Sequence, residues 1–236
     1  LYADIPLWCK EGYIDYNVPQ LYWKIGYERA DYDVLIHWWN DGNFGGHLYI
    51  GQSIGTFNEP DLKDSTKVQM EEKMRLVREL PNVHGNVWWP GWSIAQAGRP
   101  RRPSPRPEAA NFRPRRPQIN IMDSLMVTYQ KYPALIPAYS HIDAIAPDPV
   151  AAIKASGKTL KWSVAPTADP MQEVGFYVVY RFPAGVDIDI EDSKYIVAIT
   201  KDTQYVAEKK SPKATYVVTV TDHCWNESAP SDPVKM

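Results

Sequence analysis

Residues 11–23 read EGYIDYNVPQLYW, and this stretch decides the fold. An apolar, β-prone run ends abruptly at Pro19 and is followed by Gln20, Tyr22 and Trp23. A buried strand that stops and then offers polar and aromatic side chains is typical of the substrate-binding rim of a parallel α/β barrel. The stretch therefore points more firmly to sugar binding than to a complete catalytic site.

The order strand then helix occurs three times within residues 1–131. In the first repeat, Tyr32, Leu35, Ile36 and Trp39 have the spacing of an amphipathic helix. Repeated strand–helix units predict parallel strands joined by right-handed crossovers, and thus an α/β fold with part of a TIM-type barrel. The expected strands are 13–18, 47–52 and 83–89, the expected helices are 32–39, 65–79 and 123–131, and a helix capped by Asp4 ends near residue 10.

The third repeat is interrupted by an arginine- and proline-rich insertion at residues 98–120. It holds six Pro and seven Arg against one acidic residue. Proline at this density excludes a helix or a central strand, so we expect an extended or disordered segment. Binding to an anionic polymer is one interpretation, and a solvated loop without a partner is the other.

The chain changes character after residue 131. Residues 132–150 are punctuated by proline and are predicted to be a linker that ends a first domain spanning 1–150. Residues 151–236 contain short alternating segments that predict a β-sandwich. With Trp162 and Tyr216 as core aromatics and NESAPS as the final edge, this domain resembles a fibronectin type III module. The expected strands are 160–164, 176–181, 195–200 and 216–221.

Composition excludes several classes of function. A net charge of −2 over 236 residues gives no general reason to bind nucleic acid, and no 18-residue apolar span is present to cross a membrane. Cys9 and Cys224 are far apart and are predicted to be buried thiols rather than a disulfide. No Cys/His spacing suits a metal, and we expect no cofactor. No secretory signal is present, but Leu1 is not an initiator Met, so its absence says little about where the protein acts.

Candidate sugar-binding residues follow the three predicted strands. Amide groups can donate to and accept from sugar hydroxyls at once, and flat indole rings can stack on sugar faces. The alternatives are a buried amide that ties two loops together, and ordinary core filling by the aromatic rings. The candidates are Gln20, Tyr22 and Trp23 after the first strand, Gln52 after the second, Trp88 and Trp89 after the third, and Trp39 on a helix.

Catalytic carboxylates are less evident. Glycosidases ordinarily use two carboxylates, but the residues at the strand ends are not acids. Glu59 and Asp61 lie in the loop after the second strand, whereas Asp15 comes too early in its strand. Glu59 is the weak catalytic candidate, with a solvated loop acid or a partner for a sugar hydroxyl as the alternatives.

Several motifs together carry a family resemblance. In order they are YADIPLWCKEGYIDYNVPQLYW, YDVLIHWW, HLYIGQ, GNVWW and a terminal module ending in WNESAPS. Over nearly the whole chain they resemble the glycosyl-hydrolase-like 10 family, and the arginine- and proline-rich insertion departs from its pattern. The resemblance implies a secreted or lipid-anchored bacterial protein with a TIM-like barrel that cleaves glycans, with peptidoglycan glycan strands as a candidate substrate.

The resemblance also implies that this chain holds only part of a barrel. A closed barrel has eight strand–helix units, and three are recognisable here. We therefore expect the closing part of a barrel, with its main catalytic carboxylates upstream and its open sheet covered by a further segment or by self-association. The leading hypothesis is a portion of an extracytoplasmic glycoside hydrolase that is inactive alone. The alternative is a noncatalytic carbohydrate-binding or scaffold protein.

Overall fold

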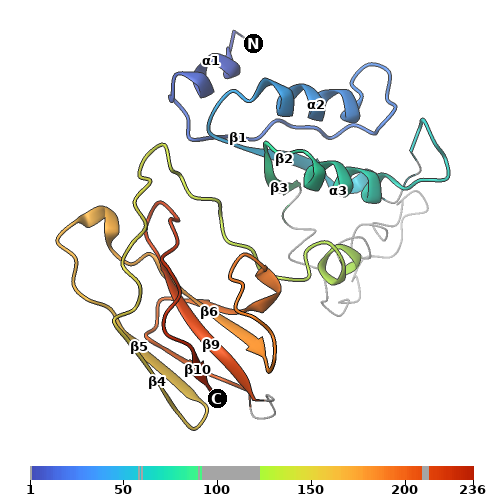
Figure 1. The fold of residues 1–236 in the computed structure, drawn as a ribbon. Helices are drawn as coiled ribbons and strands as arrows, with labels where there is room; N and C mark the ends of the chain where they lie inside the picture. Colours follow the sequence, from blue (N-terminus) through green and yellow to red (C-terminus); the bar gives the residue numbers. More distant parts are fainter. Residues whose placement is uncertain (1, 58, 60, 90, 92–122, 209–212) are drawn as a thin grey trace, which may run out of the picture. The chain divides into compact units, whose positions relative to one another are not determined.

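The computed structural model describes residues 2–57, 59, 61–89, 91, 123–208 and 213–236. The chain divides into two compact units, Leu1–Lys131 and Tyr132–Met236 (Figure 1). The division falls where the predicted linker begins, and not after residue 150, where the first domain was predicted to end. The arginine- and proline-rich insertion at 98–120 lies outside the described residues. The two roles considered for it therefore stay predictions.

The first unit is built on a parallel sheet, as the repeated strand–helix order predicted. In its described residues the sheet has three strands in the order β1-β2-β3, and both neighbouring pairs are parallel. Three strands do not by themselves close a barrel. The elements are α1 (Ile5–Lys10), β1 (Tyr16–Asn17), α2 (Tyr32–Gly42), β2 (His47–Ser53), the 3-10 turn η1 (Ile54–Thr56), α3 (Gln69–Glu79) and β3 (Val83–Trp89).

Local chemistry sets several of these boundaries. Asp4 caps α1, as predicted, because its Oδ1 accepts a hydrogen bond from the Leu7 amide at 3.1 Å. Helix α1 ends at Lys10 and is followed by Gly12, whose φ is +69°, and the Tyr13 amide donates back to the Trp8 carbonyl at 2.9 Å. This C-terminal cap uses Tyr13, which was predicted to begin the first strand. Strand β1 is consequently shorter than predicted, although an isolated parallel bridge extends its pairing to Gln20.

Helices α2 and α3 cover one face of the parallel sheet. Leu48 and Ile50 of β2 pack against Ile36 of α2 and against Leu76 and Val77 of α3 in one buried cluster. This burial of apolar area is the main contribution that holds the helices on the sheet. A further segment, 123–127, is helical and shorter than the predicted 123–131; its Leu125 joins a second buried cluster formed with Ile54, Phe57 and Met74.

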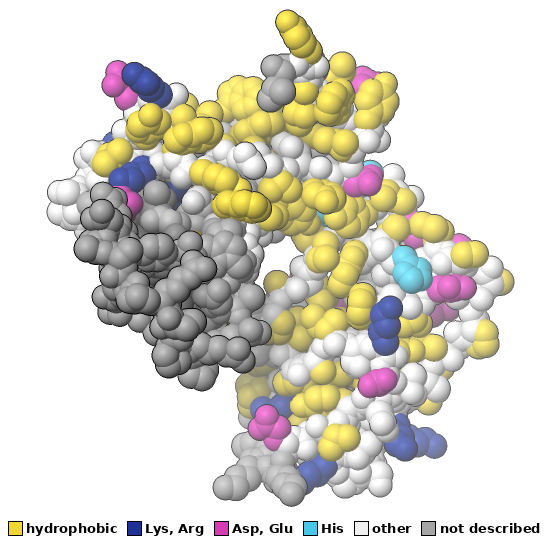
Figure 2. All heavy atoms as spheres, turned by 180° about the vertical axis from the view of Figure 1, so that it is seen from behind, with side chains coloured by type: hydrophobic (Ala, Val, Ile, Leu, Met, Phe, Trp, Pro, Cys, Tyr) yellow, Lys and Arg dark blue, Asp and Glu magenta, His cyan; other side chains and the backbone are white. Residues whose placement is uncertain are grey.

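The opposite face of the parallel sheet is open in the described residues. Tyr16, Val87 and Trp89, one from β1 and two from β3, are all exposed large apolar side chains. On the face of the molecule seen in Figure 2, hydrophobic side chains gather over part of the first unit. An apolar sheet face of this kind ordinarily marks a surface that another segment or a ligand covers.

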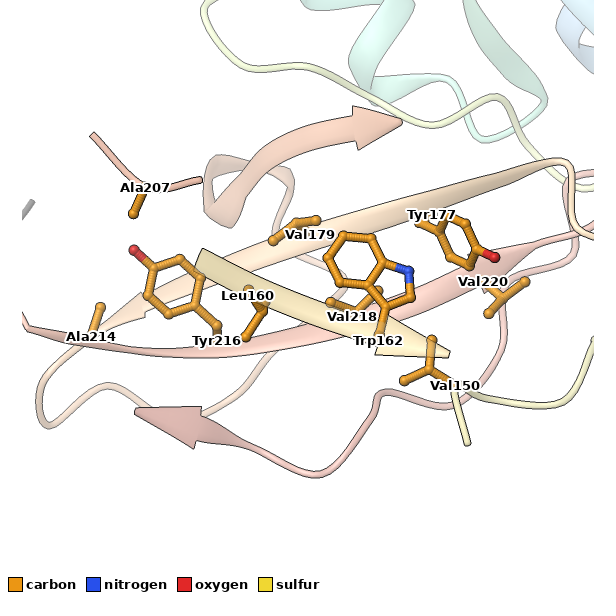
Figure 3. Packing of buried hydrophobic residues seen from close by; sticks show 10 residues of the cluster. All are labelled: Val150, Leu160, Trp162, Tyr177, Val179, Ala207, Ala214, Tyr216, Val218 and Val220. Carbon is orange, nitrogen blue, oxygen red and sulfur yellow. The ribbon is translucent and has the colours of Figure 1, made fainter. Parts of the chain in front are cut away.

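The second unit consists of two antiparallel sheets with a shared core. Leu160 and Trp162 from one sheet meet Tyr177, Tyr216 and Val218 from the other (Figure 3). Trp162 and Tyr216 are buried, as predicted. Among the described residues the sheets have the orders β10-β9-β6-β7 and β4-β5-β8. The strands are β4 (Ala152–Ser156), β5 (Thr159–Ser163), β6 (Phe176–Pro183), β7 (Ile196–Thr200), β8 (Gln204–Val206), β9 (Ala214–Thr221) and β10 (Val234–Lys235), of which β4, β8 and β10 were not predicted.

Residues 132–150 have neither helix nor strand, yet they pack on the second unit. The Tyr139 amide donates to the Cys224 carbonyl at 2.8 Å, and Asn226 Nδ2 donates to the Asp143 carbonyl at 3.0 Å. Val150 enters the core between the two sheets. The segment is therefore held by hydrogen bonds and by apolar burial.

The NESAPS segment lies along strand β9. Ser228 Oγ accepts from the Val220 amide at 2.9 Å, and Ser231 Oγ accepts from the Val218 amide at 3.0 Å. These hydroxyls satisfy main-chain donors of a buried strand in a segment that is broken by proline. Figure 1 shows β10, which follows this segment, beside β9.

Candidate functional site

The carboxyl ends of β1, β2 and β3 meet at one edge of the parallel sheet. Gln20 pairs with Gly51, and Gly51 pairs in turn with Val87. Side chains that pair across parallel strands point to the same face, and consecutive side chains along a strand point to opposite faces. Gln20 therefore shares the open face with Val87 and with Trp89, two residues further along β3.

The residues available to a ligand at this edge are Gln20, Trp89 and Trp23. Gln20 is exposed, and the Trp89 and Trp23 side chains are 60% and 44% exposed. Tyr22, which lies between Gln20 and Trp23 in the chain, is half-buried. An exposed amide and two exposed indole rings provide both hydrogen-bonding groups and flat apolar surfaces, the combination that a sugar ring requires.

Gln52 lies on the other face of the sheet, under the helices. Its side chain is 0% exposed, and its Nε2 donates to the Tyr32 hydroxyl at 2.7 Å and to Asn86 Oδ1 at 3.0 Å. Burial raises the pKa of the Tyr32 hydroxyl, which therefore stays protonated. The structure does not bring Gln52 together with Gln20 and Trp89. Gln52 instead ties β2 to α2 and β3, which is the alternative that the sequence left open.

Two of the predicted aromatic residues are also separated from the open face. Trp88 pairs with Gln52 and packs against Phe57, with ring centroids 5.5 Å apart. Trp39, near the end of α2, lies against Trp38 and lines a small cavity together with His47 at the start of β2. A helix that returns the chain between two parallel strands ends beside their amino ends, so Trp39 is at the edge opposite to Gln20.

Glu59 joins the loops that follow β1 and β2. Its carboxylate forms an ion pair with Lys24, and its carbonyl accepts from the Gln69 amide at 2.9 Å. Asp61, the other predicted carboxylate of this loop, is buried, and its Oδ1 accepts from the Lys63 amide at 2.7 Å. Asp61 therefore shapes a turn, and Glu59 is the one of these two acids with an exposed carboxylate.

Lys73 of α3 was not recognised from the sequence. Its side chain is 0% exposed, and its Nζ donates to the Trp23 carbonyl at 2.6 Å. The Nζ atom lies 4.4 Å from the centroid of the Tyr32 ring and 5.5 Å from that of Phe57. Loss of hydration on burial lowers the pKa of Lys73 to about 7. The sequence signal was a polar residue beside the apolar stripe of a helix, which usually indicates a solvated position.

Gln69, one turn before Lys73, is a second buried polar residue of α3. Its Oε1 accepts from the Ile25 amide at 2.9 Å, and its Nε2 lies 3.4 Å from the Ile25 carbonyl. The side-chain amide thus pairs with both main-chain groups of one residue in the loop after β1. Gln69 and Lys73 together hold the main chain of residues 23–25.

Two further kinds of feature concern the described ranges of the chain, a metal site and a membrane-spanning helix. Within those ranges, no three or more His, Cys, Asp and Glu side chains are arranged to hold a metal ion. In the same part of the chain, no helix has the length and apolar character needed to span a membrane.

Comparison with known proteins supports a family assignment for the N-terminal part of the chain. Residues 1–69 match the glycosyl hydrolase-like 10 family. The chain is also 30% identical over 244 residues to Glycosyl hydrolase YngK of Bacillus subtilis, a match that covers 98% of this chain and 43% of that protein. It is 31% identical over 94 residues to Glycosyl hydrolase DigH of Escherichia coli O6:H1, covering 36% of this chain and 21% of that protein.

The chain is therefore shorter than these relatives, spanning less than half of the first and about a fifth of the second. Among solved structures, the β-1,2-glucanase from Parabacteroides distasonis is 22% identical, with a TM-score of 0.27 over 44% of this chain and 13% of that one. A TM-score this low supports no conclusion about a shared fold or activity.

Proposed function

We propose that this chain is part of a glycoside hydrolase and that it binds glycan at the carboxyl edge of its parallel sheet. The observation that carries the proposal is the shared open face of Gln20 and Trp89 at the ends of parallel strands, in a unit whose first 69 residues match a glycosyl hydrolase-like family. Active sites of parallel α/β barrels are built at this edge, from the segments that follow the strands.

The parallel sheet is then an arc of a TIM-type barrel. In such a barrel the helices form the outer ring and the uncovered face of the sheet points inward. The helices α2 and α3 on one face, and the exposed Tyr16, Val87 and Trp89 on the other, agree with that arrangement. The remaining strands would come from the rest of a longer protein, because the chain spans 43% of one relative. Self-association of two open sheets is the competing arrangement.

The principal catalytic carboxylates would lie in that remaining part. Glycoside hydrolysis ordinarily requires two carboxyl groups, roughly 5 to 10 Å apart. Of the two candidate acids after β2, Asp61 is buried in a turn and Glu59 is paired with Lys24. Glu59 is retained as the weak catalytic candidate, and its ion pair also suits it to orient Lys24 or to accept a hydrogen bond from a sugar hydroxyl.

Further parts of the proposal rest mainly on the resemblance. The second unit would be a fibronectin type III-like module that supports or docks the barrel; its two antiparallel sheets with a shared core are consistent with this. Peptidoglycan glycan strands would be the substrate, and the protein would act outside the cytoplasm, as a periplasmic, cell-surface or secreted protein.

The test compares this chain with a longer parent protein that supplies the rest of the barrel. Release of reducing sugar from peptidoglycan glycan strands is measured for both, together with binding by calorimetry. The expected result is turnover by the longer protein only, and weaker binding when Gln20 and Trp89 are changed to Ala. Val34→Ala, at an exposed position of α2 on the side of the sheet that the helices cover, is the matched control. Unchanged binding by the double variant would refute the site.

A noncatalytic carbohydrate-binding or scaffold protein is the second candidate. The ion pair between Glu59 and Lys24 favours it, because this carboxylate already has a partner that joins two loops, a structural role that requires no proton transfer. Binding without turnover in both the chain and the longer parent would establish this alternative and exclude hydrolysis.

A further inference from the structure

Two buried polar side chains of α3 form hydrogen bonds with the main chain of the loop that follows β1. Gln69 and Lys73 are four residues apart, so they lie on the same side of the helix. Gln69 pairs with the amide and carbonyl of Ile25, and Lys73 Nζ donates to the carbonyl of Trp23 at 2.6 Å. Both side chains are 0% exposed.

An apolar residue would be the ordinary choice at these two positions. Their neighbours Met74 and Val77 are buried in the clusters between α3 and the sheet. Burying an amide or an amine is unfavourable unless it forms hydrogen bonds, and here the partners are main-chain atoms of a loop. The two polar side chains therefore fix the path of that loop rather than fill space.

The loop they hold carries exposed residues of the proposed glycan site. Trp23 is 44% exposed, and the next residue, Lys24, forms the ion pair with Glu59 from the loop after β2. A carbonyl fixed at Trp23 restricts the main chain on which the indole ring is mounted. The same contact sets the position of the Lys24–Glu59 pair.

We propose that Gln69 and Lys73 are positioning residues, which act through the main chain of residues 23–25 to present Trp23 and the Lys24–Glu59 pair to the glycan. The inference rests on the proposed function for its ligand. Helix α3 would then contribute to glycan binding through the main chain of this loop, without any direct contact between its side chains and the glycan.

A double-mutant cycle tests the proposal on the whole chain. The variants are Lys73→Met, Trp23→Ala and their combination, and the dissociation constant for glycan strands is measured for each. If Lys73 acts through Trp23, Lys73→Met should weaken binding about two- to tenfold, the range for one aromatic contact. Its further effect should be clearly smaller once Trp23 is Ala, when only the Lys24–Glu59 pair still depends on it. Lys67→Met is the control on the segment just before α3, because Lys67 is largely solvated.

Hydrogen exchange of the segment 21–27 gives a second readout that needs no ligand. Lys73→Met, and separately Gln69→Leu, should speed exchange of the Ile25 and neighbouring amides at least tenfold, while exchange in β2 stays unchanged. Additive effects in the cycle, or unchanged exchange of this segment in both variants, would overturn the proposal. If the wild-type chain binds no glycan, the proposed function fails by itself and the exchange experiment decides the positioning role. Gln69→Leu serves if Lys73→Met does not fold.

Discussion

Replacing Lys73 by Met should change the stability of the first unit in a way that reverses sign with pH. Burial lowers the pKa of Lys73 from 10.5 to about 7. In the unfolded chain the amine recovers its ordinary pKa, so between about pH 7 and 10 the unfolded state binds a proton that the folded state does not. The free energy of unfolding therefore rises with pH across this window and is flat below it.

The size of the effect follows from the pKa. Each pKa unit corresponds to about 1.36 kcal/mol, so the protonated lysine should reduce stability at pH 6 by about 5 kcal/mol relative to the neutral amine. Methionine avoids this penalty but leaves the Trp23 carbonyl without its donor, a loss of about 1–3 kcal/mol. The variant should be more stable than the wild type by about 2–4 kcal/mol at pH 6, and less stable by about 1–3 kcal/mol near pH 10.

Urea unfolding at pH 6, 8 and 10, followed by tryptophan fluorescence, measures this difference. Seven of the nine Trp residues lie within the first 92 residues, so the signal reports mainly on the first unit. Lys67→Met is the control, and its effect should stay below about 1 kcal/mol at each pH because the Lys67 side chain is solvated and weakly paired. A difference between Lys73→Met and wild type that is constant from pH 6 to pH 10 would refute the reasoning.

Three further substitutions test individual contacts. Gln52→Leu should lower the free energy of unfolding by about 1–3 kcal/mol, because it removes the donor to the buried Tyr32 hydroxyl and to the half-buried Asn86 side chain. Glycan binding by the folded protein should stay unchanged, and calorimetry showing a direct loss of affinity would contradict the placement of Gln52 under the helices. Gly46→Ala should destabilise the first unit by at least about 1 kcal/mol in urea unfolding, since Gly46 has a φ of +66° and a Cβ would lie 2.6 Å from the Asp15 carbonyl oxygen. Ser231→Ala should reduce the stability of the second unit by about 1–3 kcal/mol, measured by circular dichroism, because the buried Val218 amide loses its acceptor. Ser231→Thr keeps a hydroxyl and should have a smaller effect on stability. Equal losses in the two variants would argue against the hydrogen bond.

Much of the secondary structure could be predicted because its causes are local. Strand β3 occupies the predicted residues Val83–Trp89, and α3 ends at Glu79, two residues before the proline that was expected to stop it. Asp4 caps α1 as expected. The parallel direction of the strands followed from the strand–helix order, since a helical crossover returns the chain to the same edge of the sheet.

The division of site residues between two faces could not be predicted. Gln20 and Gln52 both follow apolar runs at strand ends, and the chain alone does not say on which side of each strand the helices pack. Because Gln20 pairs with Gly51, the next residue, Gln52, points to the other face, where its side chain donates a hydrogen bond to the Tyr32 hydroxyl. Trp88 is carried to the same side for the same reason, because consecutive residues of a strand alternate between faces.

The sequence by itself determined the order of strands and helices in the first unit, the parallel direction of its sheet and the buried aromatics of the second unit, because periodicity and turn chemistry depend on near neighbours. Tertiary structure alone decided that Lys73 is buried, that Gln52 is a structural amide and that Trp89 is exposed. These three outcomes depend on which surfaces of α2, α3 and the sheet meet, and that choice is made by burying apolar area between residues far apart in the chain.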